Sequence, residues 1–191
     1  MPNFFSAFTT EVFRPIATLL IPGAIGISTW FIRLMWQFSD VRAMVGESHT
    51  ETILLLLRAM IFSGLVLEDF GTRWETFMDE CADGCTDNMN RIQWNQYLRT
   101  AFVADPIGRR YIRTLVLRLK FELGIAFAMA SAAIGLVWLS RLGLSRTVVT
   151  RSYILCLCFI TWGLYEAVAT HAVLANSRAN LLLGEIRVIG K

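Results

Sequence analysis

The chain has 191 residues, of which 55 % are apolar and 17 % are charged. Soluble domains carry roughly 25 % charged residues, and the apolar residues of this chain are gathered in long runs. The composition therefore argues against an ordinary soluble domain and favours a membrane protein. The net charge of +3 is small, so the placement of the charges along the chain is more informative than their sum.

The first 14 residues predict a short amphipathic helix before any membrane span. Large apolar side chains recur there at helical spacing, at Phe4, Phe5, Phe8, Val12 and Phe13. Such a helix suits the cytoplasmic surface of a bilayer, and packing against the spans is the alternative. The segment lacks the basic start of a cleavable signal peptide, so we expect the first span to remain in the protein.

Four apolar runs predict membrane-spanning helices, because a spanning helix needs roughly 20 mostly apolar residues. They lie at Pro15–Phe31, Thr50–Leu67, Phe121–Ser140 and Tyr153–Leu174. Pro22 removes a backbone donor from the first run and predicts a kink. The sequence therefore predicts an all-α, polytopic membrane protein with four transmembrane helices and a helical cytoplasmic insert between the second and third.

The expected divisions of the chain follow from these runs. They are an amphipathic N-terminal helix (1–14), a first transmembrane hairpin (15–70), the insert (71–120), a second transmembrane hairpin (121–174) and a cytoplasmic tail (175–191). Twelve lysines and arginines fall on the side that holds both termini and the insert, and five fall on the other side. The positive-inside rule then places the insert and both termini in the cytoplasm.

Two charged residues lie deep inside predicted spans. Arg58 interrupts the second apolar run, and Glu166 lies in the fourth. A charge at such a depth costs on the order of 2.5–3.5 kcal/mol on insertion scales and usually faces a bundle interior or water. The two residues either form a structural ion pair or line a water-accessible pore or gate.

The third predicted span carries small residues at close spacing, at Gly124, Ala128, Ala132 and Gly135. Small residues allow helix backbones to approach closely in lipid. We therefore expect this span to pack tightly against another helix, within one chain or between copies. A pore wall built of small residues is the alternative.

The insert is acidic in its first part and basic in its second. From Glu68 to Asn90 there are seven acids and one base, and from Arg91 to Lys120 there are seven bases and one acid. Apolar periodicity predicts helices over residues 74–81 and 94–102, with Gly84 ending the first. A third helix is predicted to run from Pro106 without interruption into the third span.

The basic part of the insert is the candidate binding site for a polyanion. On a helix, Arg109, Arg113 and Lys120 lie within about 40° of one another, Arg110 flanks them, and Arg118 points elsewhere. Clustered arginines attract phosphates, and aromatic side chains can stack on bases. The candidate residues are Trp94, Arg99, Arg109, Arg110, Tyr111, Arg113 and Lys120. The alternatives are a belt that binds anionic lipid headgroups and internal pairing with the acidic part.

No motif in the chain indicates an enzyme. The sequence lacks G-x-S-x-G, HExxH and a phosphate-binding glycine loop. Its four cysteines and two histidines do not have the spacing of a zinc site, and reduced cytoplasmic thiols are the simpler interpretation. We expect no catalysis, no bound metal and no cofactor.

This layout resembles that of the channel-forming effectors of the bacterial Hailong anti-phage defence system. The resemblance is carried above all by the run Arg109-Arg110-Tyr111-Ile112-Arg113 and the spans around it. The resemblance implies a homotetramer, or pairs of tetramers, whose electropositive loops hold single-stranded DNA oligomers made by a partner nucleotidyltransferase. Loss of the oligomer would open an ion channel and depolarise the cell, an abortive infection. The acidic part of the insert departs from a simple basic basin.

A second interpretation has the same layout but no channel. The four-span membrane subunit of the Kiwa defence system is similar, and that similarity implies a membrane sensor or scaffold. Such a subunit would recruit a soluble defence partner through the insert. The two interpretations differ in whether the purified protein conducts ions.

Overall fold

The structure is a computed structural model that describes residues 14–83, 107–142 and 145–189. These residues form five α-helices and one short 3-10 turn, and no strand occurs among them. The helices are α2 (Arg14–Gln37), α3 (Ser39–Glu47), α4 (His49–Asp83), α6 (Ile107–Leu139) and α7 (Arg146–Ile189), with η2 (Ser140–Leu142) between the last two. The all-α prediction is confirmed for this part of the chain.

Three helices are long and apolar enough to cross a membrane. The spans are Ile16–Gln37 in α2, Tyr111–Leu139 in α6 and Arg146–Ser177 in α7. They overlap the first, third and fourth predicted spans, so the membrane assignment is supported by three segments. The last two begin at Tyr111 and Arg146, earlier than the predicted starts at Phe121 and Tyr153. The run Thr50–Leu67 lies in α4, which is not among the three. A fourth span therefore stays a prediction.

The helix α4 does not stop where the second span was predicted to end. It continues for 35 residues, from His49 to Asp83, because the apolar run and the acidic amphipathic segment share an unbroken helical pattern. The boundary predicted at residues 70/71 is therefore not a break in the structure. The described part of this helix ends at Asp83, and Gly84, which was predicted to terminate it, lies outside the described residues.

The helix α6 confirms the prediction of one continuous basic-to-apolar helix. It runs for 33 residues from Ile107 to Leu139 and includes both the basic segment and the third predicted span. The second predicted helix of the insert, residues 94–102, lies outside the described residues. The N-terminal amphipathic helix predicted over residues 1–14 also lies outside them, apart from Arg14, which begins α2.

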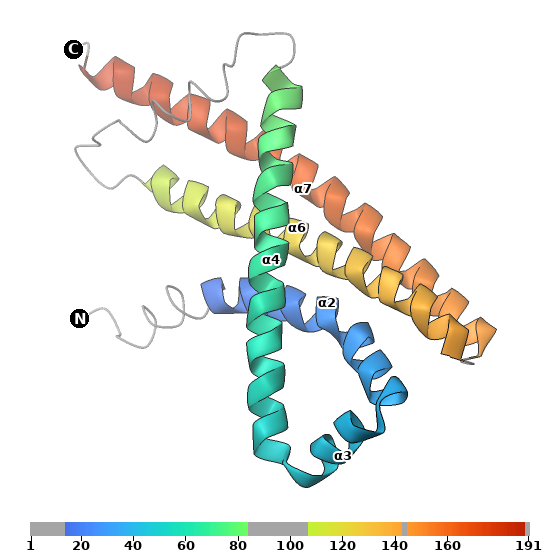
Figure 1. The fold of residues 1–191 in the computed structure, drawn as a ribbon. Helices are drawn as coiled ribbons and strands as arrows, with labels where there is room; N and C mark the ends of the chain where they lie inside the picture. Colours follow the sequence, from blue (N-terminus) through green and yellow to red (C-terminus); the bar gives the residue numbers. More distant parts are fainter. Residues whose placement is uncertain (1–13, 84–106, 143–144, 190–191) are drawn as a thin grey trace.

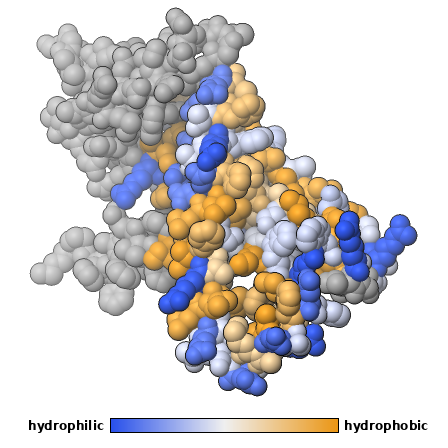
Figure 2. All heavy atoms as spheres, viewed as in Figure 1, coloured by the Kyte–Doolittle hydropathy of each residue, from blue (hydrophilic) through white to orange (hydrophobic). Residues whose placement is uncertain are grey.

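The helices are arranged as a hairpin with two further helices packed on it (Figure 1). The long helices α6 and α7 lie side by side and antiparallel, and α2 packs on α6. The helix α4 runs across α2 and α6 rather than along them, and the short α3 joins α2 to α4. Apolar residues cover much of the described surface seen in Figure 2, as expected of a chain that meets lipid or other apolar partners.

The crossing of α2 and α4 depends on two glycines. A Cβ atom on Gly23 would collide with the carbonyl oxygen of Met60, and one on Gly64 would collide with the carbonyl oxygen of Leu19. The two backbones therefore approach so closely that neither position has room for a side chain. Close backbone approach at glycine is a common way of packing helices in lipid.

Small residues also form the contact between α2 and α6. A Cβ atom on Gly124 would lie 3.2 Å from Cγ of Pro22, and one on Gly135 would collide with Thr29. Ala128 and Ala132 are buried. The interpretation of the small residues as helix-packing positions is confirmed, and their partner is α2 of the same chain. The helix α2 continues through Pro22, whose side chain is fully buried.

Candidate functional site

Hydrogen-bonded charges join α4, α6 and α7 at the end of the bundle where the basic segment of α6 begins. We call this group of side chains the charged layer. Its members are Glu68 and Asp79 of α4, Arg118, Lys120 and Glu122 of α6, and Glu166, Thr170 and His171 of α7. Arg118, Glu122 and Glu166 belong to segments apolar enough to span a membrane, where ionisable residues commonly have a functional role.

Glu122 is the most buried carboxylate of the charged layer, with 9 % of its side chain exposed. Nε of Arg118 donates to its Oε1 at 2.6 Å, and Oγ1 of Thr170 donates to its Oε2 at 2.8 Å. A buried carboxylate is strongly destabilising unless it is paired and hydrogen-bonded. Here both oxygen atoms have a donor, one from the same helix and one from α7.

Arg118 connects two carboxylates on different helices. Besides its contact with Glu122, its second terminal nitrogen donates to Oε2 of Glu166 at 2.9 Å. The planar guanidinium offers five N–H donors in a fixed geometry, so one arginine can bind two carboxylates at once. This contact ties the start of the apolar part of α6 to α7.

Two further pairs tie α4 to this hairpin. Nζ of Lys120 donates to Oε1 of Glu68 at 2.8 Å, which links α6 to α4. Nε2 of His171 lies 2.8 Å from Oδ1 of Asp79, which links α7 to α4. All three helices are therefore connected pairwise by polar contacts. A shift of α6 along its axis would have to break contacts on two sides.

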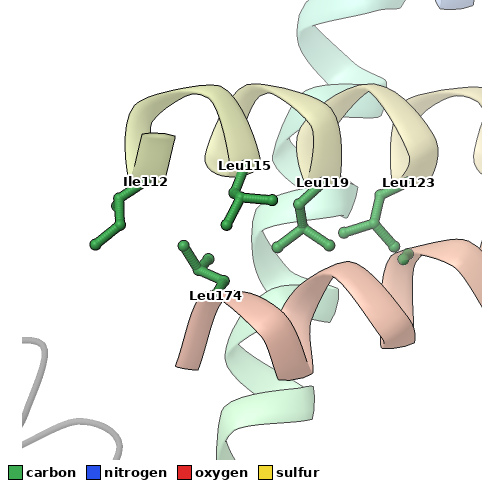
Figure 3. Close-up of a cluster of buried hydrophobic side chains, with 6 residues drawn as sticks. Ile112, Leu115, Leu119, Leu123 and Leu174 are labelled. Atoms are coloured by element: carbon green, nitrogen blue, oxygen red, sulfur yellow. The ribbon is translucent and has the colours of Figure 1, made fainter. Parts of the chain in front are cut away.

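An apolar core packs α6 against α7 (Figure 3). Ile112, Leu115, Leu119 and Leu123 extend from one face of α6, and Leu174 of α7 meets them. Leu119 is fully buried. The leucines recur every four residues, so the apolar face remains in register with α7 over several turns. The core aligns the two helices, and Arg118, Glu122 and Glu166 lie beside it.

The structure describes only part of the predicted polyanion site. Tyr111 is half exposed at the start of α6, and Arg113 is exposed one half-turn later. Arg109 and Arg110 lie in the first turn of the same helix. Lys120 is bound to Glu68, so for this residue the alternative of internal pairing with the acidic part is observed. Trp94 and Arg99 lie outside the described residues.

The two predicted pore or gate residues are not brought together. Glu166 pairs with Arg118, which excludes the expected alternative in which its partner is Arg58. Arg58 is exposed on α4, and it makes no ion pair or hydrogen bond with any residue that the structure describes. Pairing with Arg118 rather than Arg58 follows from the packing, because α7 lies alongside α6.

Sequence reasoning missed Glu122, Thr170 and His171. A signal was present for each of them: Glu122 lies one helical turn after Arg118, a spacing at which opposite charges pair, and Thr170 lies one turn after Glu166. His171 falls near the end of the fourth predicted span. These spacings identify the face of each helix, but only the contact between helices selects the partners.

Comparisons with known proteins give no assignment. No protein-family model, no curated protein and no solved structure matches this chain. Within residues 14–83, 107–142 and 145–189, no group of three or more His, Cys, Asp or Glu side chains has the arrangement of a metal site. The function has to be inferred from the arrangement of the helices and their charges.

Proposed function

We propose that this chain is an oligomeric membrane ion-channel effector of bacterial anti-phage defence, gated by a polyanion bound to its basic cytoplasmic residues. The observation that carries the proposal is the continuity of α6. One unbroken helix begins with Arg109, Arg110 and Arg113, passes through the charged layer and continues as an apolar segment. A ligand held at its first turns acts directly on the packing of the spanning segment.

The polyanion that fits this chemistry best is a single-stranded DNA oligomer. Its phosphates would be bound by the arginines of α6, and its bases would stack on Tyr111, which is half exposed. Copies brought together by oligomerisation, as a homotetramer or pairs of tetramers, would combine their basic segments into one basin. A partner nucleotidyltransferase is the class of enzyme that would supply such an oligomer.

The proposed topology has four spans, with α4 as the second. Both termini and the insert then lie in the cytoplasm, and the protein resides in the bacterial inner membrane with lipid around its apolar faces. Arg58 would lie at the mid-depth of α4, and Glu166 would lie where α7 enters the charged layer. In this proposal the charged layer holds α6 in the closed position while the oligomer is bound.

The test is conductance of the purified protein in planar bilayers of phosphatidylethanolamine and phosphatidylglycerol. Short single-stranded DNA oligomers are added to the cytoplasmic side, and double-stranded DNA of the same length and an uncharged peptide nucleic acid serve as controls. We expect current without the oligomer and loss of current when it binds. Absence of current under every condition would exclude a channel.

A second candidate is a membrane sensor or scaffold that recruits a soluble partner. The observation that favours it is a groove of about 550 Å³ between α4 and α7, lined mainly by apolar residues such as Phe77, Met78 and Val168, with His171 among them. The exposed side chain of Phe77 at this groove could anchor a partner helix. A stable partner that purifies with the protein in mild detergent, together with no conductance, would favour this candidate.

A further inference from the structure

The helices α2 and α6 run in the same direction and reach one end of the bundle together (Figure 1). A Cβ atom on Gly124 would touch the side chain of Pro22. Two turns farther along, Nε1 of Trp30 donates to Oγ of Ser131 at 3.1 Å. Residue numbers rise together along this contact, so the two helices are parallel. Both are long and apolar enough to span a membrane, and parallel spans leave a membrane on the same side.

Two tryptophans and one arginine join the ends of these two spans. The span of α2 ends at Gln37 and that of α6 at Leu139. One turn before the first end, the guanidinium carbon of Arg33 lies 3.9 Å from the centroid of the Trp138 ring. The ring of Trp30 packs on Trp138 at a centroid distance of 5.9 Å. These contacts place the two span ends at one level, and tryptophan is enriched at the level of the lipid headgroups.

Arg33 has most of its hydrogen-bond donors unused. Its side chain is partly buried, and its one hydrogen bond to a described residue is long, from Nε to Oε1 of Gln37 at 3.4 Å. It forms no ion pair with any residue in the described ranges. The nearest carboxylate in the sequence, Asp40, accepts a hydrogen bond from Ser39. A guanidinium has five N–H donors, so the four on its terminal nitrogens are available to a ligand.

The chemistry around Arg33 selects an anion with apolar chains attached. A guanidinium binds a phosphate through two parallel N–H groups, and the indole ring beneath it stabilises the cation. Leu34 and Val137, the chain neighbours of Arg33 and Trp138, are each 46 % exposed and offer an apolar surface beside the charge. Phospholipids carry both parts, a phosphate at the headgroup level and acyl chains below it.

The surrounding charge favours an anionic lipid over a zwitterionic one. Arg141 is exposed on η2, one turn beyond Trp138, and Arg146 begins α7. No Asp or Glu occurs from residue 123 to residue 165, so α6 and α7 bring no negative charge to this end. Basic sites between membrane helices commonly bind anionic headgroups.

We propose that Arg33, supported by the ring of Trp138, binds the phosphate of an anionic phospholipid whose acyl chains lie along the exposed apolar residues of α2 and α6. The lipid contacts both helices, so its binding stabilises their packing at this end. The inference goes beyond the proposed function, because it requires only that α2 and α6 span the membrane, whether or not the protein conducts ions.

The test is the thermal stability of the purified protein in an uncharged detergent. Phosphatidylglycerol, phosphatidylethanolamine with the same acyl chains, and inorganic phosphate are added separately at equal concentration. At about ten times the Kd, phosphatidylglycerol should raise Tm by about 3–6 °C. Phosphatidylethanolamine, whose ammonium group offsets its phosphate, should give a clearly smaller rise, and inorganic phosphate should give none. An equal rise with phosphatidylethanolamine overturns the selection of an anionic headgroup, and an equal rise with inorganic phosphate overturns lipid as the ligand.

Arg33→Gln tests the residue that binds the phosphate. The rise in Tm is measured within each variant, with and without lipid, so a change in the stability of the variant itself does not affect the result. Arg33→Gln should weaken binding about tenfold, which reduces the rise to about 1–2 °C. Arg151→Gln is the matched control, because it removes the same charge from an exposed position near the start of α7, and it should keep the full rise. An undiminished rise in Arg33→Gln overturns the proposal.

The basic segment at the other end of α6 has to be separated from this site, because its arginines can also attract anionic headgroups. Arg109→Gln with Arg113→Gln removes two of these charges and should keep the rise that Arg33→Gln loses. The reverse result, with the rise lost in the double variant and kept in Arg33→Gln, places the lipid at the basic segment and overturns the proposal.

The support given by Trp138 is tested by two substitutions of its ring. Trp138→Leu leaves the guanidinium without an aromatic face and should weaken lipid binding about fivefold. Trp138→Phe keeps an aromatic face and should retain most of the binding. Equal losses in the two variants would show that the ring does not position Arg33 for the phosphate.

Discussion

The ε-amino group of Lys120 on α6 donates a hydrogen bond to the carboxylate of Glu68 on α4 at 2.8 Å. Two residues earlier, Arg118 binds Glu166 of α7, so α6 is held from two sides at nearly the same level. Glu68 follows the apolar run of α4 directly, and Lys120 precedes the third predicted span. The pair therefore joins the end of the apolar run of α4 to a point within the candidate span Tyr111–Leu139 of α6.

The first prediction concerns this ion pair. Lys120→Glu places two carboxylates together, and we expect it to weaken the hold on α6 and to produce leak current that the oligomer no longer suppresses. Both side chains are partly exposed, so the stability change should be only about 1 kcal/mol. The double variant Lys120→Glu with Glu68→Lys should restore the wild-type current in planar bilayers.

The matched control for this prediction is an ion pair that lies wholly within α4. Arg73 and Asp69 form an exposed pair at 2.9 Å within one helix, and Arg73→Glu reverses the same amount of charge without a partner on α6. It should leave the current unchanged. If Arg73→Glu produces the same leak current as Lys120→Glu, the leak is caused by the change in net charge, and the Lys120–Glu68 pair does not hold α6.

The second prediction concerns the crossing of α2 and α4. Gly23→Ala and Gly64→Ala each put a methyl group onto a backbone carbonyl, where no flexible side chain can move aside. Overpacking of this kind costs about 1–3 kcal/mol or more, so we expect a clear fall in Tm in detergent. Gly46→Ala is the control, because a Cβ there meets no atom within 4 Å and alanine favours a helix by about 1 kcal/mol. If Gly64→Ala has the same Tm as the control Gly46→Ala, the close backbone contact at the crossing of α2 and α4 is contradicted.

The third prediction concerns Glu122. Glu122→Leu removes the carboxylate that accepts hydrogen bonds from Arg118 and Thr170, and it should lower the free energy of unfolding. Breaking a buried ion pair costs roughly 3–5 kcal/mol. We expect a loss at the lower end of that range, because Arg118 keeps its contact with Glu166. Glu80→Gln, at an exposed position of α4, should change stability by less than about 0.5 kcal/mol. Urea or thermal unfolding in detergent measures both. Equal stability of the two variants would mean that the contacts of Glu122 are unimportant.

The fourth prediction concerns the basic segment. Arg109→Glu with Arg113→Glu should abolish binding of single-stranded DNA oligomers at moderate salt. Any residual binding should depend less steeply on salt. The slope of the logarithm of the binding constant against the logarithm of the salt concentration should become shallower by about 0.7 for each phosphate that the protein no longer neutralises. Arg146→Glu with Arg151→Glu reverses the same charge at the start of α7, beyond the other end of α6, and should leave binding unchanged. Binding that persists in the first variant with the same salt dependence would support the lipid-belt interpretation.

The fifth prediction concerns the topology of α4. Position 46 on α3 and Cys81 near the end of α4 are both exposed. The test uses a variant that carries Gly46→Cys and the natural Cys81 and no other cysteine. An impermeant maleimide added to intact cells should label position 46, and it should label Cys81 only after permeabilisation. Labelling of both from one side would mean that α4 does not cross the membrane, and the two termini would then lie on opposite sides.

Much of the helical organisation could be read from the sequence, because hydropathy and periodicity are local properties. The segments that form α6 and α7 were identified from their apolar runs, and the uninterrupted pattern after Pro106 correctly predicted one helix from the basic segment to Leu139. The small residues of the third span were correctly assigned to packing, since a position such as Gly124 has few other uses in lipid.

The candidate site was less predictable, because its contacts join residues about 50 to 90 positions apart. Helical spacing showed that Arg118 faces away from the other bases, but it could not show that its partners are Glu122 and Glu166. The same limit applied to Lys120, whose partner Glu68 belongs to a helix that crosses α6 rather than running along it.

The sequence by itself therefore determined which segments are helical and apolar, because each such property depends on neighbours within a few turns. Only the tertiary structure decided which charges meet. The angle at which α4 crosses α2 is set by the contact of Gly23 and Gly64 with opposing carbonyl groups. The apolar core of Leu119 and Leu174 fixes the register of α6 against α7. These two packing contacts place Lys120 beside Glu68 and Arg118 beside Glu166, and they leave Arg58 on the outer face of the bundle.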